Sequence, residues 1–350
     1  MHVPRGLFAV GLTALLLTAG VAGGLGGVAA QSGSDCSYPL TVTDSTDTEI
    51  TIEEEPETVV TLAPSAAQTM YEIGAQEKVI GISDRATYLD WDEEKEIVSG
   101  EEGFVNTERV IAQDPDIVLA PDIISEEKVE QLRQDEDLTV YHFGASETMD
   151  DVVEKTRLIG QLTGECEGAD AKATEMEQTL DTVAEAVDGE DSPRVLYAFA
   201  GYTSGEGTFI DEILTTAGAT NVASEAGISG FQMVSDEVVA NQSPEWIVVN
   251  DEAPGIPDKE AYNETPAVQN DQIVTVNAHS ISQAAPRTVD VVEHIASELH
   301  PEAYESAQAT TTEDTQNEDT TAVTTETEAP GFGPIVALLA LGGAAFLRRE

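Results

Sequence analysis

The segment DPDIVLA, residues 114–120, places a polar turn directly before four apolar residues. A short apolar run bounded by a turn is typical of a strand that is buried on both faces of a parallel sheet. The segment VVTLAPS, residues 59–65, contains a similar run, and helical spacing then extends from Ala66 to Ile73 before Gly74 ends it. Strand and helix therefore alternate around both segments, which indicates a parallel α/β unit.

The same alternation continues outward and repeats after a long interval. In the first half we expect further strands at Lys78–Ile82 and Leu138–Phe143 and a helix at Asn106–Ala112. In the second half we expect strands and helices at Arg194–Phe199, Phe209–Ala217, Trp246–Asn250, Ile273–Asn277 and Val289–Leu299. The sequence therefore predicts two α/β lobes with parallel sheets, over residues 58–146 and 191–303.

Residues 147–190 separate the two lobes and carry no strand pattern. They contain two stripes at helical spacing, formed by Val152, Val153, Thr156, Ile159 and Leu162 and by Met176, Leu180, Val183 and Val187. Gly164 and Gly168 interrupt the segment. We expect a long helical bridge, which would make the hinge between the lobes stiff.

Residues 1–30 have the layout of a secretory signal peptide. Arg5 supplies the positive charge, residues 7–28 are apolar and rich in Gly and Ala, and the small residues 28–30 offer a cleavage site before Gln31. A permanent membrane anchor is the alternative. Cleavage would leave residues 31–57 as an N-terminal strap.

The other end of the chain has two parts beyond the second lobe. Residues 304–329 are dominated by Thr, Glu and Asp, which predicts an extended linker. Residues 330–350 begin with Pro-Gly-Phe, continue through an apolar run, and include Arg348 and Arg349. This layout resembles the PGF-type sorting tail of archaeal surface proteins. The resemblance implies cutting by an archaeosortase, lipid attachment and a place on the outer face of the membrane; a short membrane anchor is the alternative.

The net charge limits the possible partners. The 350-residue chain carries 67 Asp and Glu against 15 Lys and Arg, a formal net charge of -52. Such a surface repels nucleic acid, whose phosphates require cationic partners. Concentrated salt would screen the repulsion between the acids, and the pattern resembles secreted proteins of salt-loving archaea.

The chain has two cysteines, Cys36 and Cys166. Export would place them in an oxidising compartment, so we expect one disulfide between the strap and the bridge. Two distant thiols are too few for a metal site. The sequons at Asn241 and Asn263 are candidate glycosylation sites on an exported chain, although a proline directly follows each sequon.

A series of short motifs, in a fixed order over residues 59–299, resembles the cobalamin and iron-siderophore substrate-binding family of ABC importers. In addition to the two segments above, the series contains NTERV at 106–110, TFIDE at 208–212, AGATNV at 217–222, VSDEVV at 234–239, SP at 243–244 and APR at 285–287. The resemblance is greatest to the cobalamin-binding type. It implies a monomeric, non-enzymatic protein without a cofactor, whose cleft holds a corrinoid; a ferric siderophore or haem is the alternative ligand.

The resemblance also implies an ABC permease and its ATPase as partners. By motif, the family's two permease-docking glutamates fall on Glu108 and Glu237, one in each lobe. A carboxylate on each lobe would let arginines of the permease test the spacing of the lobes. The alternative is that both are ordinary solvated acids.

A large, partly apolar ligand favours aromatic contacts in the cleft. The candidates are aromatic residues in predicted loops and one cation before the last helix: Tyr88, Trp91, Phe104, Tyr202, Phe231 and Arg287. Loop packing is the alternative role for each aromatic residue, and a structural salt bridge is the alternative for Arg287. The family's tryptophan-rich cleft is replaced here by smaller aromatic residues.

Two other classes of protein remain as alternatives. A zinc or manganese importer would need about three His with a carboxylate, whereas only His142 and His279 lie near predicted strand ends. An enzyme would need a recognisable set of catalytic or phosphate-binding residues. The sequence contains no Gly-x-Ser-x-Gly elbow, no phosphate loop and no His-Glu-x-x-His motif.

Overall fold

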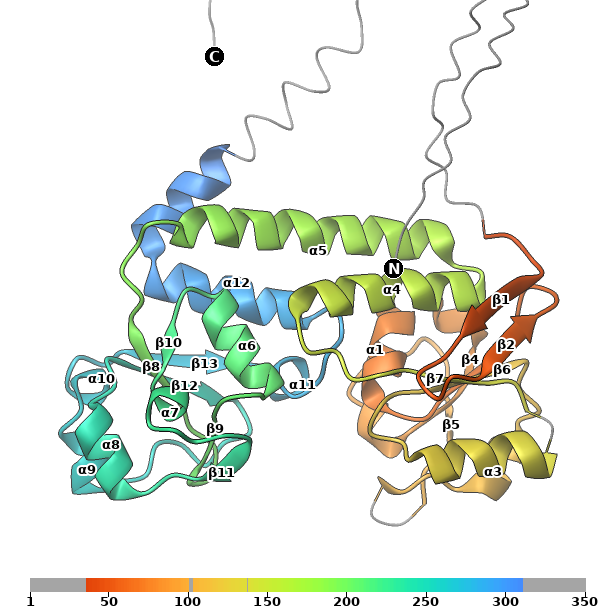
Figure 1. Cartoon of the computed structure of the whole chain (residues 1–350), viewed down its shortest axis with the longest axis horizontal. Coiled ribbons are helices and arrows are strands. Elements are labelled where there is room, and N and C mark those ends of the chain that lie inside the picture. Colours follow the sequence, from red (N-terminus) through yellow and green to blue (C-terminus); the bar gives the residue numbers. More distant parts are fainter. Residues whose placement is uncertain (1–35, 101–102, 137, 311–350) are drawn as a thin grey trace, which may run out of the picture.

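The computed structural model describes residues 36–100, 103–136 and 138–310. Two α/β lobes lie side by side, and long helices cross above both of them in the view of Figure 1. The N-terminal lobe has a five-stranded sheet in the order β5-β4-β3-β6-β7, and the C-terminal lobe has a four-stranded sheet in the order β10-β8-β12-β13. Every pairing within these two sheets is parallel, which confirms the predicted fold class.

The N-terminal lobe follows the predicted alternation of strand and helix. Its elements are β3 (Val59–Thr61), α1 (Pro64–Glu72), η1 (Gln76–Lys78), β4 (Val79–Ile82), η2 (Asp84–Ala86), β5 (Glu96–Ile97), α2 (Thr107–Ala112), β6 (Ile117–Ala120), α3 (Glu126–Glu136) and β7 (Val140–His142). The central strand β3 and its neighbour β6 are buried along their whole length. This explains why their sequences are continuous apolar runs rather than alternating patterns.

The C-terminal lobe is built in the same way. Its elements are β8 (Arg194–Tyr197), β9 (Tyr202–Ser204), α6 (Phe209–Thr216), β10 (Thr220–Asn221), α7 (Val222–Glu225), β11 (Phe231–Met233), α8 (Asp236–Gln242), β12 (Trp246–Asn250), α9 (Glu260–Asn263), α10 (Pro266–Gln269), β13 (Ile273–Val276), α11 (Ala278–Ile281) and α12 (Thr288–Leu299). Strands β9 and β11 pair antiparallel outside the main sheet. The sequence did not predict this small ribbon.

The bridge consists of two helices, α4 (Met149–Thr163) and α5 (Cys166–Val187). A reciprocal capping box between Thr148 and Asp151 starts α4, and Gly164 ends it in the left-handed conformation at φ 82°. A methyl group on Gly160 would lie only 2.2 Å from Cβ of Ala169, so the small residue lets the two helices approach closely near this turn. Figure 1 shows α5 running over both lobes, as expected for a helical bridge.

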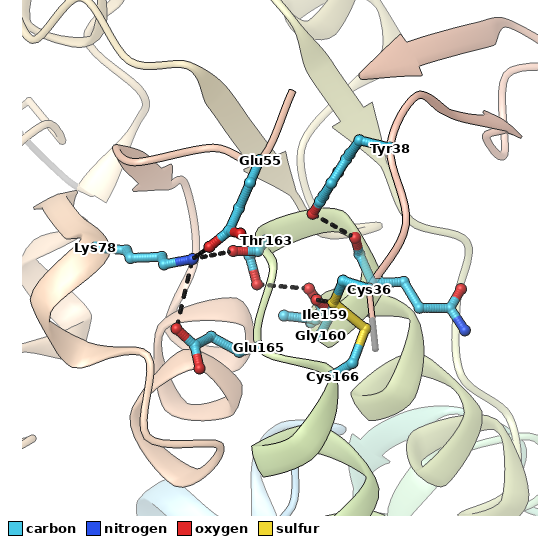
Figure 2. Close-up of a disulfide and its surroundings, with 10 residues drawn as sticks. Cys36, Tyr38, Glu55, Lys78, Ile159, Gly160, Thr163, Glu165 and Cys166 are labelled. Atoms are coloured by element: carbon cyan, nitrogen blue, oxygen red, sulfur yellow. Dashed lines mark hydrogen bonds and ion pairs between the residues drawn. A yellow bond between two sulfur atoms is a disulfide. The ribbon is translucent and has the colours of Figure 1, made fainter. Parts of the chain in front are cut away.

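The strap folds onto the N-terminal lobe as a hairpin of β1 (Leu40–Thr43) and β2 (Glu49–Ile52). A disulfide joins Cys36 to Cys166, the first residue of α5 (Figure 2). Beside it, Nζ of Lys78 lies 2.7 Å from Oε1 of Glu55 and donates to the carbonyl of Thr163 at 2.7 Å. Strap, sheet and bridge are thus held together at one end of α4.

The helical region of the C-terminal lobe extends further than the sequence predicted. Residues 301–310 are helical, and Tyr304 and Ala307 are buried in the core of the lobe. The predicted linker, which began at residue 304, therefore starts too early. Tyr304 and Ala307 supply the buried apolar contacts of this helical segment, and the Glu, Ser and Thr residues around them hid the pattern in the sequence. The predicted signal peptide, the remainder of the linker and the sorting tail lie outside the described residues.

Asp44, in the loop of the hairpin, carries a buried charge. It forms an ion pair with Arg133 of α3 and accepts hydrogen bonds from the backbone N–H groups of Thr46 at 2.9 Å and His142 at 3.1 Å. Burial by itself raises the pKa of Asp44, but hydrogen bonds from Thr46, Arg133 and the backbone outweigh it and lower the pKa to about 2. Other contacts hold the hairpin beside this carboxylate: the backbone N–H of Ser45 donates to the carbonyl of His142 at 3.0 Å, and Ile50 and Ile52 pack into the core of the lobe.

We expect Asp44→Asn to lower the free energy of unfolding at neutral pH by about 3 kcal/mol, because it leaves the Arg133 guanidinium buried without a counter-charge. The folded pKa lies below the ordinary value of 3.8, so this stabilisation is present above that pH and is lost as the pH falls toward 2. Urea unfolding in molar salt at several pH values measures both effects. Asp236→Asn, which breaks an exposed pair with Lys259, should cost less than about 1 kcal/mol; equal losses in the two variants would contradict the prediction.

Candidate functional site

A cavity of about 990 Å³ lies between the two lobes. It forms where the carboxyl ends of parallel strands from both sheets face each other. Leu62 and Ser83 follow strands of the first sheet, and Asn250 and His279 end or follow strands of the second. The carboxyl edge of an open parallel sheet is the usual place for a ligand in α/β proteins, so the topology itself builds this site.

The walls of the cavity are largely apolar, and both lobes contribute exposed aromatic rings. Phe104 of the first lobe is 70% exposed, and Phe231 of the second is 52% exposed. Ile123, which is 72% exposed, adds to the apolar wall of the first lobe. Large exposed apolar side chains at a cleft mark a binding surface, because water contact is unfavourable for them.

Two of the six predicted ligand residues, Phe104 and Phe231, line the cavity. Tyr202 lies directly behind, with its ring stacked on that of Phe231 at 5.1 Å between centroids. The stack forms because Tyr202 and Phe231 come from the paired strands β9 and β11. This ribbon therefore presents the ring of Phe231 to the cavity, with Tyr202 stacked against it.

Tyr88 makes contacts between the two lobes and does not line the cavity. Its ring stacks on His279 of the second lobe at 3.9 Å, and its hydroxyl accepts hydrogen bonds from Gln68 and from Gln283, each at 2.8 Å. Burial raises the pKa of Tyr88, and these two hydrogen bonds partly oppose the rise. His279 and Gln283 line the cavity, so this contact forms part of its boundary.

Trp91 and Arg287 do not line the cavity. The indole N–H of Trp91 donates to the carbonyl of Ala86 at 3.2 Å, and its ring meets Tyr71 edge-on at 5.6 Å. Nε of Arg287 lies 2.6 Å from Oε1 of Glu72 in the first lobe. The structure thus places Trp91 in loop packing and Arg287 in a salt bridge between the lobes, the alternative role considered for each.

Sequence reasoning missed the three charged residues of the cavity, Arg85, Lys128 and Glu252. Arg85 belongs to η2, just after β4, and Lys128 lies in the first turn of α3. The sequence signal that could have identified Arg85 is its position shortly after a strand, because ligand sites in α/β proteins lie at the carboxyl ends of strands. The residues 126–136 that form α3 are mostly charged, so no apolar pattern marked this helix.

Glu108 and Glu237 occupy matching positions in the two lobes. Glu108 is the second residue of α2, which Asn106 caps, and Glu237 is the second residue of α8, which Ser235 caps. Both glutamates are exposed. A carboxylate in the first turn is favoured by the helix dipole, so each charge is held at a defined point on its lobe.

The two predicted glycosylation sites and His142, a residue of the metal-importer alternative, do not line the cavity. Asn241 and Asn263, the two sequon asparagines, are exposed on α8 and α9. His142 is buried, with Nδ1 2.7 Å from Oγ of Ser45 and Nε2 2.8 Å from the carbonyl of Ile124. Among the described residues, no group of His, Cys, Asp and Glu is arranged to hold a metal ion.

The comparisons with known proteins agree with this architecture. Residues 59–279 match the family model described as "Periplasmic binding protein", and residues 329–349 match the PGF-CTERM motif. A cobalamin-binding protein of Halobacterium salinarum is 36% identical over 331 residues, covering 90% of this chain and 89% of the relative. A vitamin B12-binding protein of Pectobacterium carotovorum is 28% identical over 253 residues, covering 70% of this chain and 88% of the relative.

A similar fold is found among solved structures. The apo form of the periplasmic haem-binding protein RhuT from Roseiflexus superposes with a TM-score of 0.61 at 22% identity, covering 72% of this chain and 99% of that one.

The described part of the chain contains no helix with the length and apolar character needed to span a membrane. The family and the C-terminal motif place the protein outside the cytoplasm, at the cell surface. The two lobes, the helical bridge and the match over residues 59–279 show that the chain belongs to the periplasmic binding protein family.

Proposed function

We propose that this protein captures a corrinoid outside the cell and delivers it to an ABC permease, whose ATPase drives import. The observation that carries the proposal is the cavity of about 990 Å³ between the lobes, with exposed aromatic rings from both of them. Its size and apolar walls suit a large planar ligand better than a bare ion or a sugar. Two relatives named for cobalamin or vitamin B12 binding support the choice of corrinoid.

The ligand is cargo in this proposal, and the protein needs no resident cofactor. Phe104 and the ring pair of Tyr202 and Phe231 would contact the apolar faces of the corrin from opposite lobes. The polar contacts of Tyr88 and Arg287 hold the inner ends of the lobes together. The lobes would therefore move little, and binding would rely on a cavity that is already formed.

Calorimetry in molar salt tests the ligand. We expect cobalamin to bind at about one molecule per chain and to be recovered chemically unchanged. Phe104→Ala with Phe231→Ala should weaken binding at least about tenfold, since each buried aromatic ring contributes more than its area alone. Binding of haem or a ferric siderophore but no corrinoid would favour the alternative ligand and refute this one.

A further inference from the structure

The charges that line the cavity differ from those of the chain as a whole. Acidic residues outnumber Lys and Arg by 67 to 15 in the sequence. The cavity reverses this balance, because its walls carry Arg85 and Lys128 but a single carboxylate, that of Glu252. Both cations belong to the first lobe, and Glu252 belongs to the second. The first lobe therefore presents a positive wall inside a strongly negative protein.

Neither cation is neutralised by an acid within the described part of the chain. Nζ of Lys128 donates to Oγ1 of Thr107 at 3.0 Å and to Oε1 of Gln131 at 2.7 Å, and both acceptors are uncharged. Arg85 is exposed, and its guanidinium lies against Gly103, where an added methyl group would be 3.0 Å from Nε. In contrast, Arg287, outside the cavity, pairs with Glu72. Among residues 36–100, 103–136 and 138–310, neither Arg85 nor Lys128 thus has an acidic partner.

The same wall includes the beginnings of two helices. Ala63 and Pro64 at the start of α1, and Ser125 just before α3, line the cavity. Ala63 is the N-cap of α1 and supplies no side-chain hydrogen bond to the first turn. Helix N-termini carry partial positive charge, which adds to the positive potential of Arg85 and Lys128. Pro64, the first residue of α1, has no N–H to donate, and the backbone N–H of Lys128 already donates to Oγ of Ser125.

We propose that Arg85 and Lys128 form a subsite for an oxyanion carried by the ligand. The inference rests on the proposed function: in a corrinoid, the oxyanion is the phosphodiester of the nucleotide loop, which cobalamin has and cobinamide lacks. A guanidinium matches a phosphate with two parallel N–H donors, and an ammonium adds a mobile point charge. Glu252 on the opposite wall, 3.7 Å from Nε2 of His279, would repel the phosphate and fix the ligand's orientation.

This subsite can act even in molar salt. Screening at that ionic strength removes attraction beyond about 3 Å, so the protein's overall charge neither attracts nor repels a ligand at a distance. Charge-assisted hydrogen bonds made at contact within a partly enclosed cavity are screened much less. The discrimination should therefore appear in affinity at high salt and not in the rate of association.

The test compares three corrinoids: cobalamin, cobinamide, and cobinamide phosphate, which carries phosphate without the nucleotide base. We expect the wild-type protein to bind cobalamin and cobinamide phosphate at least about tenfold more tightly than cobinamide, because only they make the charge-assisted contacts. Arg85→Gln with Lys128→Gln should abolish this preference for phosphate and leave the affinity for cobinamide unchanged. Lys259→Gln, which removes one exposed cation from α9's N-cap, should change none of the three affinities.

Two results would overturn the subsite while the proposed function stands. One is an equal loss of affinity for all three corrinoids in the double variant, and the other is no loss at all. If no corrinoid binds, the proposed ligand is wrong, and haem with its two propionates becomes the probe. The double variant should then bind haem about tenfold more weakly, and unchanged haem affinity would overturn the subsite. Failure of the wild-type protein to bind any of these probes would overturn both proposals.

Discussion

Replacing Glu108 and Glu237 together by alanine is expected to abolish ligand uptake by cells while leaving the affinity for ligand unchanged. Both carboxylates are exposed, and each stands in the first turn of a capped helix, one per lobe. Neither lines the cavity. Their loss should remove two charge contacts with the permease without altering any group that touches the ligand.

The double variant is more informative than either single variant. Salt weakens an exposed charge pair, so shape must contribute to docking, and one remaining glutamate could sustain some transport. The family resemblance implies that both glutamates pair with arginines of the permease, so loss of both would leave those arginines without partners. Truncating a charge pair that becomes buried at an interface costs 2 kcal/mol or more, about thirtyfold, in affinity. Uptake of labelled cobalamin by cells in which the variant is the sole copy measures the effect, and calorimetry on the purified protein measures ligand affinity.

A matched control removes the same amount of charge elsewhere. Glu185→Ala with Glu298→Ala deletes two exposed carboxylates from α5 and α12, helices on the bridge side of the molecule in Figure 1, whereas α8 lies at the opposite side. This control should transport normally. Equal loss of binding and uptake in the Glu108 and Glu237 variant would show that these residues shape the cleft, and normal uptake would show that they are ordinary solvated acids.

The sheets and the bridge could be predicted because burial leaves a strong local pattern. β3 and β6 are buried on both faces, which requires apolar side chains at successive positions. The bridge helices show helical stripes because one side of each packs on the lobes. Helix α3 was missed for the opposite reason: Val129 and Leu132 are its only fully buried side chains described, and charges surround them.

The lining of the cavity was harder to predict because it depends on which strand ends meet in space. Arg287 was a reasonable candidate by its loop position, yet Glu72, more than two hundred positions earlier in the chain, forms an ion pair with it. Lys128 could not be identified from the sequence, because the charged residues around it are typical of a solvent-exposed segment. The aromatic candidates Phe104 and Phe231 do line the cavity: few aromatic residues occur in this chain, Phe104 lies in a loop after β5, and Phe231 begins β11.

The disulfide between Cys36 and Cys166 is the covalent contact that closes the strap onto the bridge (Figure 2). It spans 130 positions, so it encloses the whole first lobe in one ring of the unfolded chain. Closing a ring of this length lowers the entropy of the unfolded state by an amount worth about 5 kcal/mol in the chain-entropy model. That amount is comparable to the whole stability of many domains.

We therefore expect Cys36→Ala with Cys166→Ala to lower the free energy of unfolding by up to about 5 kcal/mol, measured by urea unfolding in molar salt. Tyr38→Phe is the matched control, because it removes a 2.9 Å hydrogen bond from the same strap to the carbonyl of Gln161 without opening the ring. Its cost should be about 1 kcal/mol.

The disulfide lies at the junction of α4 and α5, away from the cavity lining, so the folded double cysteine variant should bind ligand with unchanged affinity. A loss no greater than that of Tyr38→Phe would mean that Lys78 and the hairpin already hold the strap in place, and that ring closure contributes little to the stability of this protein.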